Sequence, residues 1–110
     1  MSFEFKAEEI AQILADAVIL AGGEPPSLST PPVFRGRQYG YIDIVDGYAI
    51  GGATTAGRLL GVEGQVIWNG DLVGELLFWI KDGRIDSIEF ASWLRPHPER
   101  WPDRSEVRFH

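Results

Sequence analysis

Three short segments with the same turn chemistry constrain what this chain can fold into. Each is a β-rich run that ends in Asp-Gly or Asn-Gly and leads into another such run: 44–47, 67–70 and 80–83. Asn-Gly and Asp-Gly favour type I′ turns, in which both central residues take positive φ. The sequence therefore predicts two-residue β-hairpins with turns at 46–47, 69–70 and 82–83. Their unequal spacing argues against a true internal repeat.

The runs around these turns predict antiparallel strands. The expected strands cover residues 38–45, 48–54, 62–68, 72–80 and 85–93. The fourth strand is apolar on both faces toward its end, which is typical of a central strand. In the last strand, Ile85 and Ile88 are three positions apart, whereas Ile88 and Phe90 are two apart. A β-bulge near 86–87 would place all three side chains on one face.

Residues 6–21 carry a helical period instead. Apolar side chains recur along one helical stripe: Ile10, Ile13, Leu14, Ala17, Val18 and Ala21. Ile19 and Leu20 widen this stripe. Gly22-Gly23 is expected to end the helix, because glycine enters the left-handed conformation without steric cost. We therefore predict an α+β fold in which one N-terminal α-helix packs on an antiparallel β-meander of about five strands.

Two segments lack a regular period. Residues 22–37 contain Pro25-Pro26 and Pro31-Pro32, so we expect a Pro-rich strap from helix to sheet, with a functional loop as the alternative. Residues 94–110 mix proline, arginine and acids and are expected to form an irregular tail. Trp101 should dock on the protein, because its large ring is costly to leave in water. With 110 residues, the chain is expected to be a single domain, 1–110.

Charge and composition narrow the possible partners. The formal net charge is −6, which disfavours nucleic acid because phosphate contacts dominate that affinity. The chain has no cysteine, which excludes a disulfide framework and a thiolate metal site. No stretch reaches the roughly 20 apolar residues needed to cross a bilayer, and the N-terminus does not resemble a signal peptide. We expect a cytoplasmic protein that binds neither membrane nor nucleic acid.

No residue pattern predicts an enzyme, a metal site or a cofactor. His97 with scattered carboxylates has no zinc-ligand spacing. The glycine-rich segment 51–58 lacks the lysine of a phosphate loop. A Ser-His-Asp set drawn from Ser87 or Ser92, His97 and Asp86 has no nucleophile elbow. We therefore expect no cofactor and favour a non-enzymatic protein.

The last strand and the tail hold the candidate binding residues. Tryptophan and arginine are enriched in interface hot spots, and 93–108 contains both. Interleaved acids nearly cancel the charge there, which disfavours stacking on nucleic-acid bases. A carboxylate in the last strand is expected to serve an interface or a ligand rather than catalysis. The candidate partner- or ligand-binding residues are Glu89, Trp93, Arg95, His97, Arg100 and Trp101.

The C-terminal third also resembles a group of small uncharacterised bacterial proteins. Residues 73–90 run from a strand through Asp82-Gly83 into a second strand carrying Ile88-Glu89, and the Pro-rich segment 98–102 follows. Some members of that group look like immunity proteins, which neutralise polymorphic toxins. The resemblance implies a protein-binding module of the bacterial cytosol and carries over no catalytic residue.

Three functions therefore stay open. The first is an immunity-like, non-enzymatic module that binds another protein, with a basic active site on the partner. The second is a small-ligand-binding protein or minor enzyme with a pocket on the sheet, lined by Tyr39, Tyr41, Glu89 and Trp93. The third is a homodimer or larger homo-oligomer assembled through an exposed edge strand.

Overall fold

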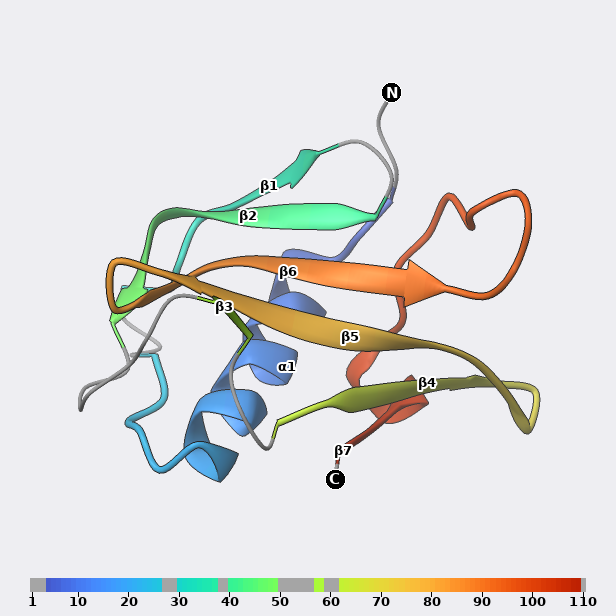
Figure 1. Ribbon diagram of the computed structural model, residues 1–110, viewed down its shortest axis with the longest axis horizontal. Helices are drawn as coiled ribbons and strands as arrows, with labels where there is room; N and C mark the ends of the chain where they lie inside the picture. Colours follow the sequence, from blue (N-terminus) through green and yellow to red (C-terminus); the bar gives the residue numbers. More distant parts are fainter. Residues whose placement is uncertain (1–3, 27–29, 38–39, 50–56, 59–61, 110) are drawn as a thin grey trace.

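One helix packs against one face of an antiparallel sheet in the computed structural model (Figure 1). The structure describes residues 4–26, 30–37, 40–49, 57–58 and 62–109. The α+β class, with an N-terminal helix on an antiparallel sheet, is confirmed. No helix in this described part of the chain is long and apolar enough to cross a membrane.

Helix α1 (Ala7–Leu20) matches the stripe predicted for residues 6–21. The five stripe residues within the helix are fully buried: Ile10, Ile13, Leu14, Ala17 and Val18. Gly22 follows with φ 85°, and the backbone N–H of Gly23 donates to the carbonyl of Val18 at 2.9 Å. The left-handed glycine therefore ends the helix as expected. Ile19 and Leu20 do not join the core and stay more than half exposed.

The sheet has seven strands among the described residues. They are β1 (Phe34–Arg37), β2 (Tyr41–Ala49), β3 (Gly57–Arg58), β4 (Gly64–Trp68), β5 (Asp71–Lys81), β6 (Arg84–Ser92) and β7 (Val107–Phe109), with a 3₁₀ turn, η1 (Arg104–Glu106), before β7. Their spatial order is β1-β2-β6-β5-β4-β7, and β3 also pairs with β5. The expected central position of β5 is confirmed.

Two of the three predicted hairpins are confirmed. Asn69 and Gly70 connect β4 to β5 with φ of 52° and 82°, and Asp82 and Gly83 connect β5 to β6 with φ of 53° and 75°. Both central residues thus take the positive φ that a type I′ turn needs. The strands β4, β5 and β6 follow one another as a meander.

The third predicted hairpin, at 46–47, is wrong. Asp46 and Gly47 do take positive φ, 65° and 67°, but they lie inside β2. The segments before and after them both pair with β6, in the registers Asp43↔Ser87 and Tyr48↔Ile85. The positive φ pair therefore lies in a bulge within the strand, after which the pairing with β6 resumes. As a result β2 lies beside β6, out of sequential order, and residues 50–54 of the predicted second strand lie outside the described residues.

Both irregular segments end in short strands. Residues 34–37 of the predicted strap form β1, and residues 107–109 of the predicted tail form β7, which pairs with β4. Prolines stop at Pro32 and Pro102, so the following backbone keeps the N–H groups that pairing requires. Both strands lie at the ends of the strand order, where single-sided pairing suffices.

The predicted bulge in β6 is confirmed. Ile80 pairs with Ile85 but Trp79 pairs with Ser87, so Asp86 is the extra residue. This shift places Ile85, Ile88 and Phe90 on the face that packs on α1, and each is at most 1% exposed. The core thus lies between α1 and one face of the sheet.

Candidate functional site

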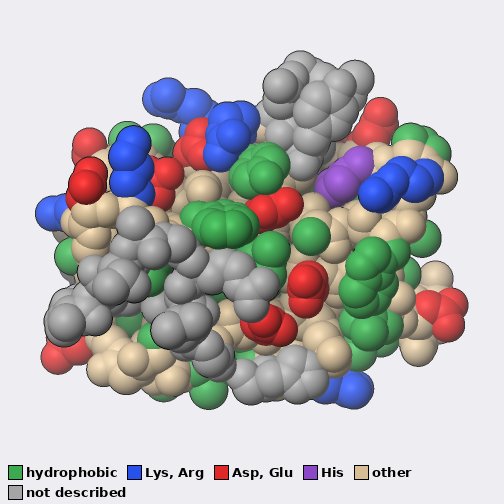
Figure 2. Space-filling view, viewed as in Figure 1, with side chains coloured by type: hydrophobic (Ala, Val, Ile, Leu, Met, Phe, Trp, Pro, Cys, Tyr) green, Lys and Arg blue, Asp and Glu red, His purple; other side chains and the backbone are tan. Residues whose placement is uncertain are grey.

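The face of the sheet opposite α1, here called the open face, carries the candidate site. In Figure 1 the sheet lies in front of α1, so Figure 2 shows this face, with hydrophobic and acidic side chains close together across its middle. Because side chains alternate along a strand, the strand registers define its residues. On the three central strands they are Tyr41, Asp43, Glu75, Leu77, Trp79, Ser87, Glu89 and Ala91, and the neighbouring strands add Arg35 and Arg37 of β1 and Gln65 of β4.

Glu89 is the centre of a hydrogen-bonded group on this face. The indole Nε1 of Trp79 donates to its Oε1 at 2.9 Å, and Tyr41, directly opposite on β2, also hydrogen-bonds to it. Burial, and then the charge and hydrogen bond of Glu89, raise the pKa of Tyr41 above its ordinary value, although Arg37 opposes them. The phenol therefore stays protonated at neutral pH and can donate to the carboxylate, whose position is fixed from two sides.

The edge of the open face holds an arginine that is already paired. Arg37 on β1 lies 3.0 Å from Asp43 through Nε, and its guanidinium carbon is 4.4 Å from the centroid of the Tyr41 ring. A guanidinium held by a carboxylate and an aromatic ring gains from both contacts. Arg37 and Asp43 thus neutralise each other at this edge.

Two more carboxylates, those of Glu75 and Glu89, lie in the middle of the face. Glu75 pairs in register with Ala91, two residues beyond Glu89 on β6, so the two carboxylates are diagonal neighbours. Among the residues whose side chains the structure describes, no ion pair reaches either of them. They lie beside Leu77 and Trp79, which gives this part of the face an acidic and aromatic character.

The chain just beyond β6, beside the start of β5, is apolar and exposed. Trp93 follows β6, and its backbone N–H donates to the carbonyl of Val73 at 2.8 Å, which fixes it beside the start of β5. Its side chain is 57% exposed, and those of Leu72 and Leu94 are 44% and 41% exposed. These three residues are here called the apolar end.

Trp101, by contrast, is a core residue. It is 3% exposed and packs edge-to-face on Phe90 with ring centroids 5.9 Å apart. Its backbone N–H donates to the carbonyl of Glu4 at 3.0 Å. The prediction that Trp101 docks is confirmed, and its ring lies inside the protein.

His97 lies between the tail and the sheet and contacts both. Its Nε2 lies 2.8 Å from the carbonyl oxygen of Phe90, and its Nδ1 lies 2.9 Å from that of Pro98. The ring also packs edge-to-face on Phe90. Both ring nitrogens therefore face backbone carbonyls, so the histidine is not paired with Ser87 or Ser92 as a catalytic set would need.

Arg100 and Arg95 also bind the chain itself. Arg100 makes two hydrogen bonds to the carboxylate of Glu106, at 3.1 and 3.2 Å, and lies 4.1 Å from the ring centroid of Trp68. Burial raises the pKa of Glu106, but hydrogen bonds from Arg100 and from the backbone of Asp103 outweigh it and hold that pKa below its ordinary value. Arg95 is exposed and donates to the carbonyls of Ser92 and Leu94 at 2.8 and 3.0 Å.

The structure thus places the six candidate residues in two regions, the open face and the tail. Glu89 lies on the open face and Trp93 just beyond β6, while His97, Arg100 and Trp101 fasten the tail and Arg95 lies at its start. The sequence analysis missed Glu75 and Trp79. Their even spacing along one strand was the available signal, since the hairpin at 82–83 and the bulge in β6 bring them onto the face of Glu89. Of the pocket residues Tyr39, Tyr41, Glu89 and Trp93, Tyr39 lies outside the described residues.

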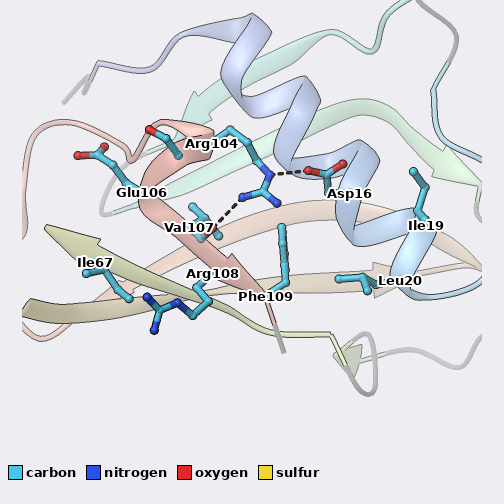
Figure 3. Close-up of a pocket in the computed structure, with 10 residues that line it drawn as sticks. Asp16, Ile19, Leu20, Ile67, Arg104, Glu106, Val107, Arg108 and Phe109 are labelled. Carbon is cyan, nitrogen blue, oxygen red and sulfur yellow. Dashed lines mark hydrogen bonds and ion pairs between the residues drawn. The ribbon is translucent and has the colours of Figure 1, made fainter. Parts of the chain in front are cut away.

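A groove lies on the other side of the molecule, between the end of α1 and β7 (Figure 3). It has a volume of about 710 Å³ and is lined in part by Ile19, Leu20 and Phe109. Arg104 crosses it, binding the carboxylate of Asp16 through Nε and the carbonyl of Val107 through a terminal nitrogen. Ile19 and Leu20 were expected to widen the buried stripe of the helix, so the sequence analysis did not predict this groove.

In the described ranges, no group of three or more histidines and carboxylates is placed to hold a metal ion. No protein-family model, no curated protein and no solved structure matches this chain.

Proposed function

We propose that this chain is a non-enzymatic module of the bacterial cytosol that binds another protein, as immunity proteins bind their toxins. The observation that carries the proposal is the apolar end, where Trp93 is 57% exposed beside Leu72 and Leu94. Grouped exposed apolar side chains mark interaction surfaces. Tryptophan is also among the residues most enriched in binding hot spots.

The setting of this surface supports the proposal. The open face is built on the paired strands β2, β6 and β5, so a partner would meet side chains on a fixed backbone. Binding to such a preorganised surface loses little conformational entropy. The net charge of −6 also suits a partner with a basic site, which the resemblance to immunity proteins implies.

Affinity capture tests this function. Tagged wild-type protein is compared with Trp93→Ala and with Leu20→Ala, which removes a similarly exposed apolar side chain from α1. We expect wild type and Leu20→Ala to capture one common protein from a lysate of the source cells. Trp93→Ala should weaken its binding by about thirtyfold, as loss of a hot-spot residue does. Failure to capture any specific protein, or equal capture by Trp93→Ala, would refute the proposal.

A small-ligand-binding protein is the second candidate. The groove between α1 and β7 favours it, because its volume of about 710 Å³ lies in the range of ligand pockets. A metabolite that binds there should raise the melting temperature, since ligands stabilise the native state. A metabolite screen by thermal shift tests this candidate, with Arg104→Gln as the variant that should lose the effect.

Assembly through an edge strand is the third candidate. β1 and β7 end the strand order, and unpaired edges can add a second copy. Both strands are short, with four and three residues, which limits the pairing that they can offer. Light scattering on the pure protein measures the oligomeric state directly.

A further inference from the structure

We infer that β1 accepts an extended, acidic segment of another protein as an additional strand of the sheet. β1 is the outermost strand at one edge (Figure 1), and in the part of the chain that the structure describes it pairs only with β2. Its residues Arg35, Gly36 and Arg37 are exposed. This inference goes beyond the proposed function, because it rests on a surface other than the apolar end.

The strand register shows which residues of β1 bond to β2. The backbone N–H of Val45 donates to the carbonyl of Val33 at 2.9 Å, so these two residues form a hydrogen-bonded pair. Hydrogen-bonded and non-hydrogen-bonded pairs alternate along antiparallel strands. With the register of β1 on β2, Arg35 and Arg37 therefore also direct their N–H and C=O groups toward β2.

Phe34 and Gly36 consequently direct their N–H and C=O groups away from β2. Within the described ranges, no backbone group hydrogen-bonds to this outer side of the strand. Outward groups spaced two residues apart are those that an added strand pairs with, and such pairing is a common mode of peptide recognition. The outer side of β1 thus offers two donors and two acceptors to an incoming strand.

The opposite edge of the sheet, at β7, is partly closed by the chain itself. The carbonyl of Val107 accepts a hydrogen bond from a terminal nitrogen of Arg104 at 2.7 Å, and the backbone N–H of Val107 donates to the carbonyl of Arg104. Arg104 therefore already uses both backbone groups of Val107. This difference favours β1 as the edge that receives a partner.

The side chains along this edge determine the chemistry of the partner. Val33, Arg35 and Arg37 alternate along one face, and Val33 is 63% exposed. The two arginines share one carboxylate, because Asp43 lies opposite Arg35 in register and bonds to Arg37 at 3.0 Å. These three charged groups sum to one positive charge. A strand with carboxylates opposite the arginines and an apolar side chain opposite Val33 complements them, since opposite charges across antiparallel strands attract.

The same arginines disfavour a second copy of this chain as the occupant. The self-pairing that uses all four outward groups places Phe34 of one copy opposite Gly36 of the other. Arg35 then lies opposite Arg35 of the second copy, and like charges directly opposite each other are destabilising. An acidic strand replaces this repulsion by attraction, so we assign the edge to a different protein.

The test uses a blocked acidic peptide, acetyl-Glu-Thr-Glu-Thr-Val-amide. Paired antiparallel to β1, it places its glutamates opposite Arg37 and Arg35 and its valine opposite Val33, while its threonines bond to Gly36 and Phe34. Binding is followed by ¹H–¹⁵N NMR of the backbone amides of Phe34 and Gly36. We expect saturable shifts with this peptide. We expect none with acetyl-Lys-Thr-Lys-Thr-Val-amide, or with the acidic peptide N-methylated at both threonines.

Two variants test the backbone and the charge separately. Gly36→Pro removes one outward N–H and keeps the bonds to β2, and proline is tolerated on edge strands for this reason. It should weaken the acidic peptide by about fivefold, the effect of one hydrogen bond. Arg35→Glu should weaken it by about tenfold, because an opposite-charge pair becomes a like-charge pair.

The matched control is Arg108→Glu, an equal charge change on an exposed residue of β7 at the opposite edge of the sheet. It should leave the affinity within about twofold, because exposed charges beyond a Debye length are largely screened. If Gly36→Pro alters the fold by circular dichroism, the N-methylated peptide still tests the same hydrogen bonds on the unmodified protein.

Three results would overturn the inference. They are unchanged Phe34 and Gly36 signals with the acidic peptide, equal binding of the lysine or the N-methylated peptide, and an effect of Arg108→Glu as large as that of Arg35→Glu. Light scattering tests the second copy: a dimer that Gly36→Pro converts to a monomer would assign this edge to self-association instead. Capture of a partner through Trp93 tests the proposed function separately, so either can fail alone.

Discussion

Phe90 joins the tail to the sheet through its ring. Three side chains pack edge-to-face on it, with centroid distances of 5.6 Å for Trp68, 5.3 Å for His97 and 5.9 Å for Trp101. Its side chain is 1% exposed. One residue of β6 therefore supports an aromatic cluster drawn from β4 and from the first half of the tail.

Removal of this ring should be strongly destabilising. Phe90→Ala is expected to lower the free energy of unfolding by about 3–5 kcal/mol, because it leaves a cavity and loses three aromatic contacts. Urea unfolding measures the change. Trp93→Ala is the control, since its side chain is largely exposed and should cost less than about 1 kcal/mol. Similar losses in both variants would show that Phe90 has no such role.

Gly40 and Gly70 show two different reasons why a position can require glycine. Both have φ of 82°, but a Cβ on Gly40 would lie 2.5 Å from Nε2 of His97, whereas nothing lies within 4 Å of one on Gly70. Gly70→Ala should therefore lose only about 1 kcal/mol of stability from the strained φ. Gly40→Ala should lose more, because its Cβ would also lie 2.7 Å from the carbonyl oxygen of Phe90, so both this backbone and His97 must move. Thermal melts of the two variants measure the difference, and equal losses would mean that neither His97 nor the carbonyl of Phe90 restricts this position.

At the scale of elements, turn chemistry was predictable from the sequence but strand partners were not. Asp46-Gly47 takes the expected positive φ, and its conformation follows from local sterics. Whether it closes a hairpin or bulges within a strand depends on which strand pairs beside it, and that strand, β6, is distant in sequence. For the same reason the amphipathic helix and the bulge in β6 were predictable, whereas the pairing of β7 with β4 was not.

On the open face too, local patterns were predictable from the sequence and long-range contacts were not. The alternation within β5 and β6 places Glu75, Trp79 and Glu89 on one side once the hairpin between them is known. The sequence therefore contained most of this part of the site. The contribution of Tyr41 depends on the pairing of β2 with β6, and the contacts of Arg100 and Trp101 with the rest of the chain depend on how the tail folds back. Local patterns cannot give such long-range contacts.

At the scale of elements, the contribution of the tail to stability should depend on pH through Glu106. Its pKa in the folded protein lies below the ordinary value of 4.5, so the unfolded chain binds the proton more readily. Its contribution to stability is therefore present above pH 4.5 and is lost as the pH falls toward the folded pKa. Glu106→Gln should flatten the loss of stability in that range. Urea midpoints at several pH values measure this, and an unchanged acid profile would contradict it.

At the scale of the whole molecule, the tail ties the helix to the sheet. Arg104 donates its backbone N–H to the carboxylate of Glu9 at 2.7 Å, and its side chain binds Asp16. At the start of the helix, the backbone N–H of Glu4 donates to the carbonyl of Glu99 at 2.7 Å. Since β7 in turn pairs with β4, the tail links α1 to an edge of the sheet remote from β1.

This link is measurable as a coupling energy between α1 and the tail. In a double-mutant cycle of Asp16→Asn and Arg104→Gln, we expect a coupling of roughly 1 kcal/mol, at the upper end for ion pairs with partial exposure. The control cycle uses Lys6 and Asp103, which also join the helix to the tail but lie 3.6 Å apart with side chains 64% and 39% exposed. Such an exposed pair should give a coupling near zero. Urea unfolding of the single and double variants gives both values. If the two couplings were equal, the contact of Arg104 with Asp16 would add nothing beyond surface attraction, and the tail would hold the helix through its hydrogen bonds to Glu9 and Glu4 instead.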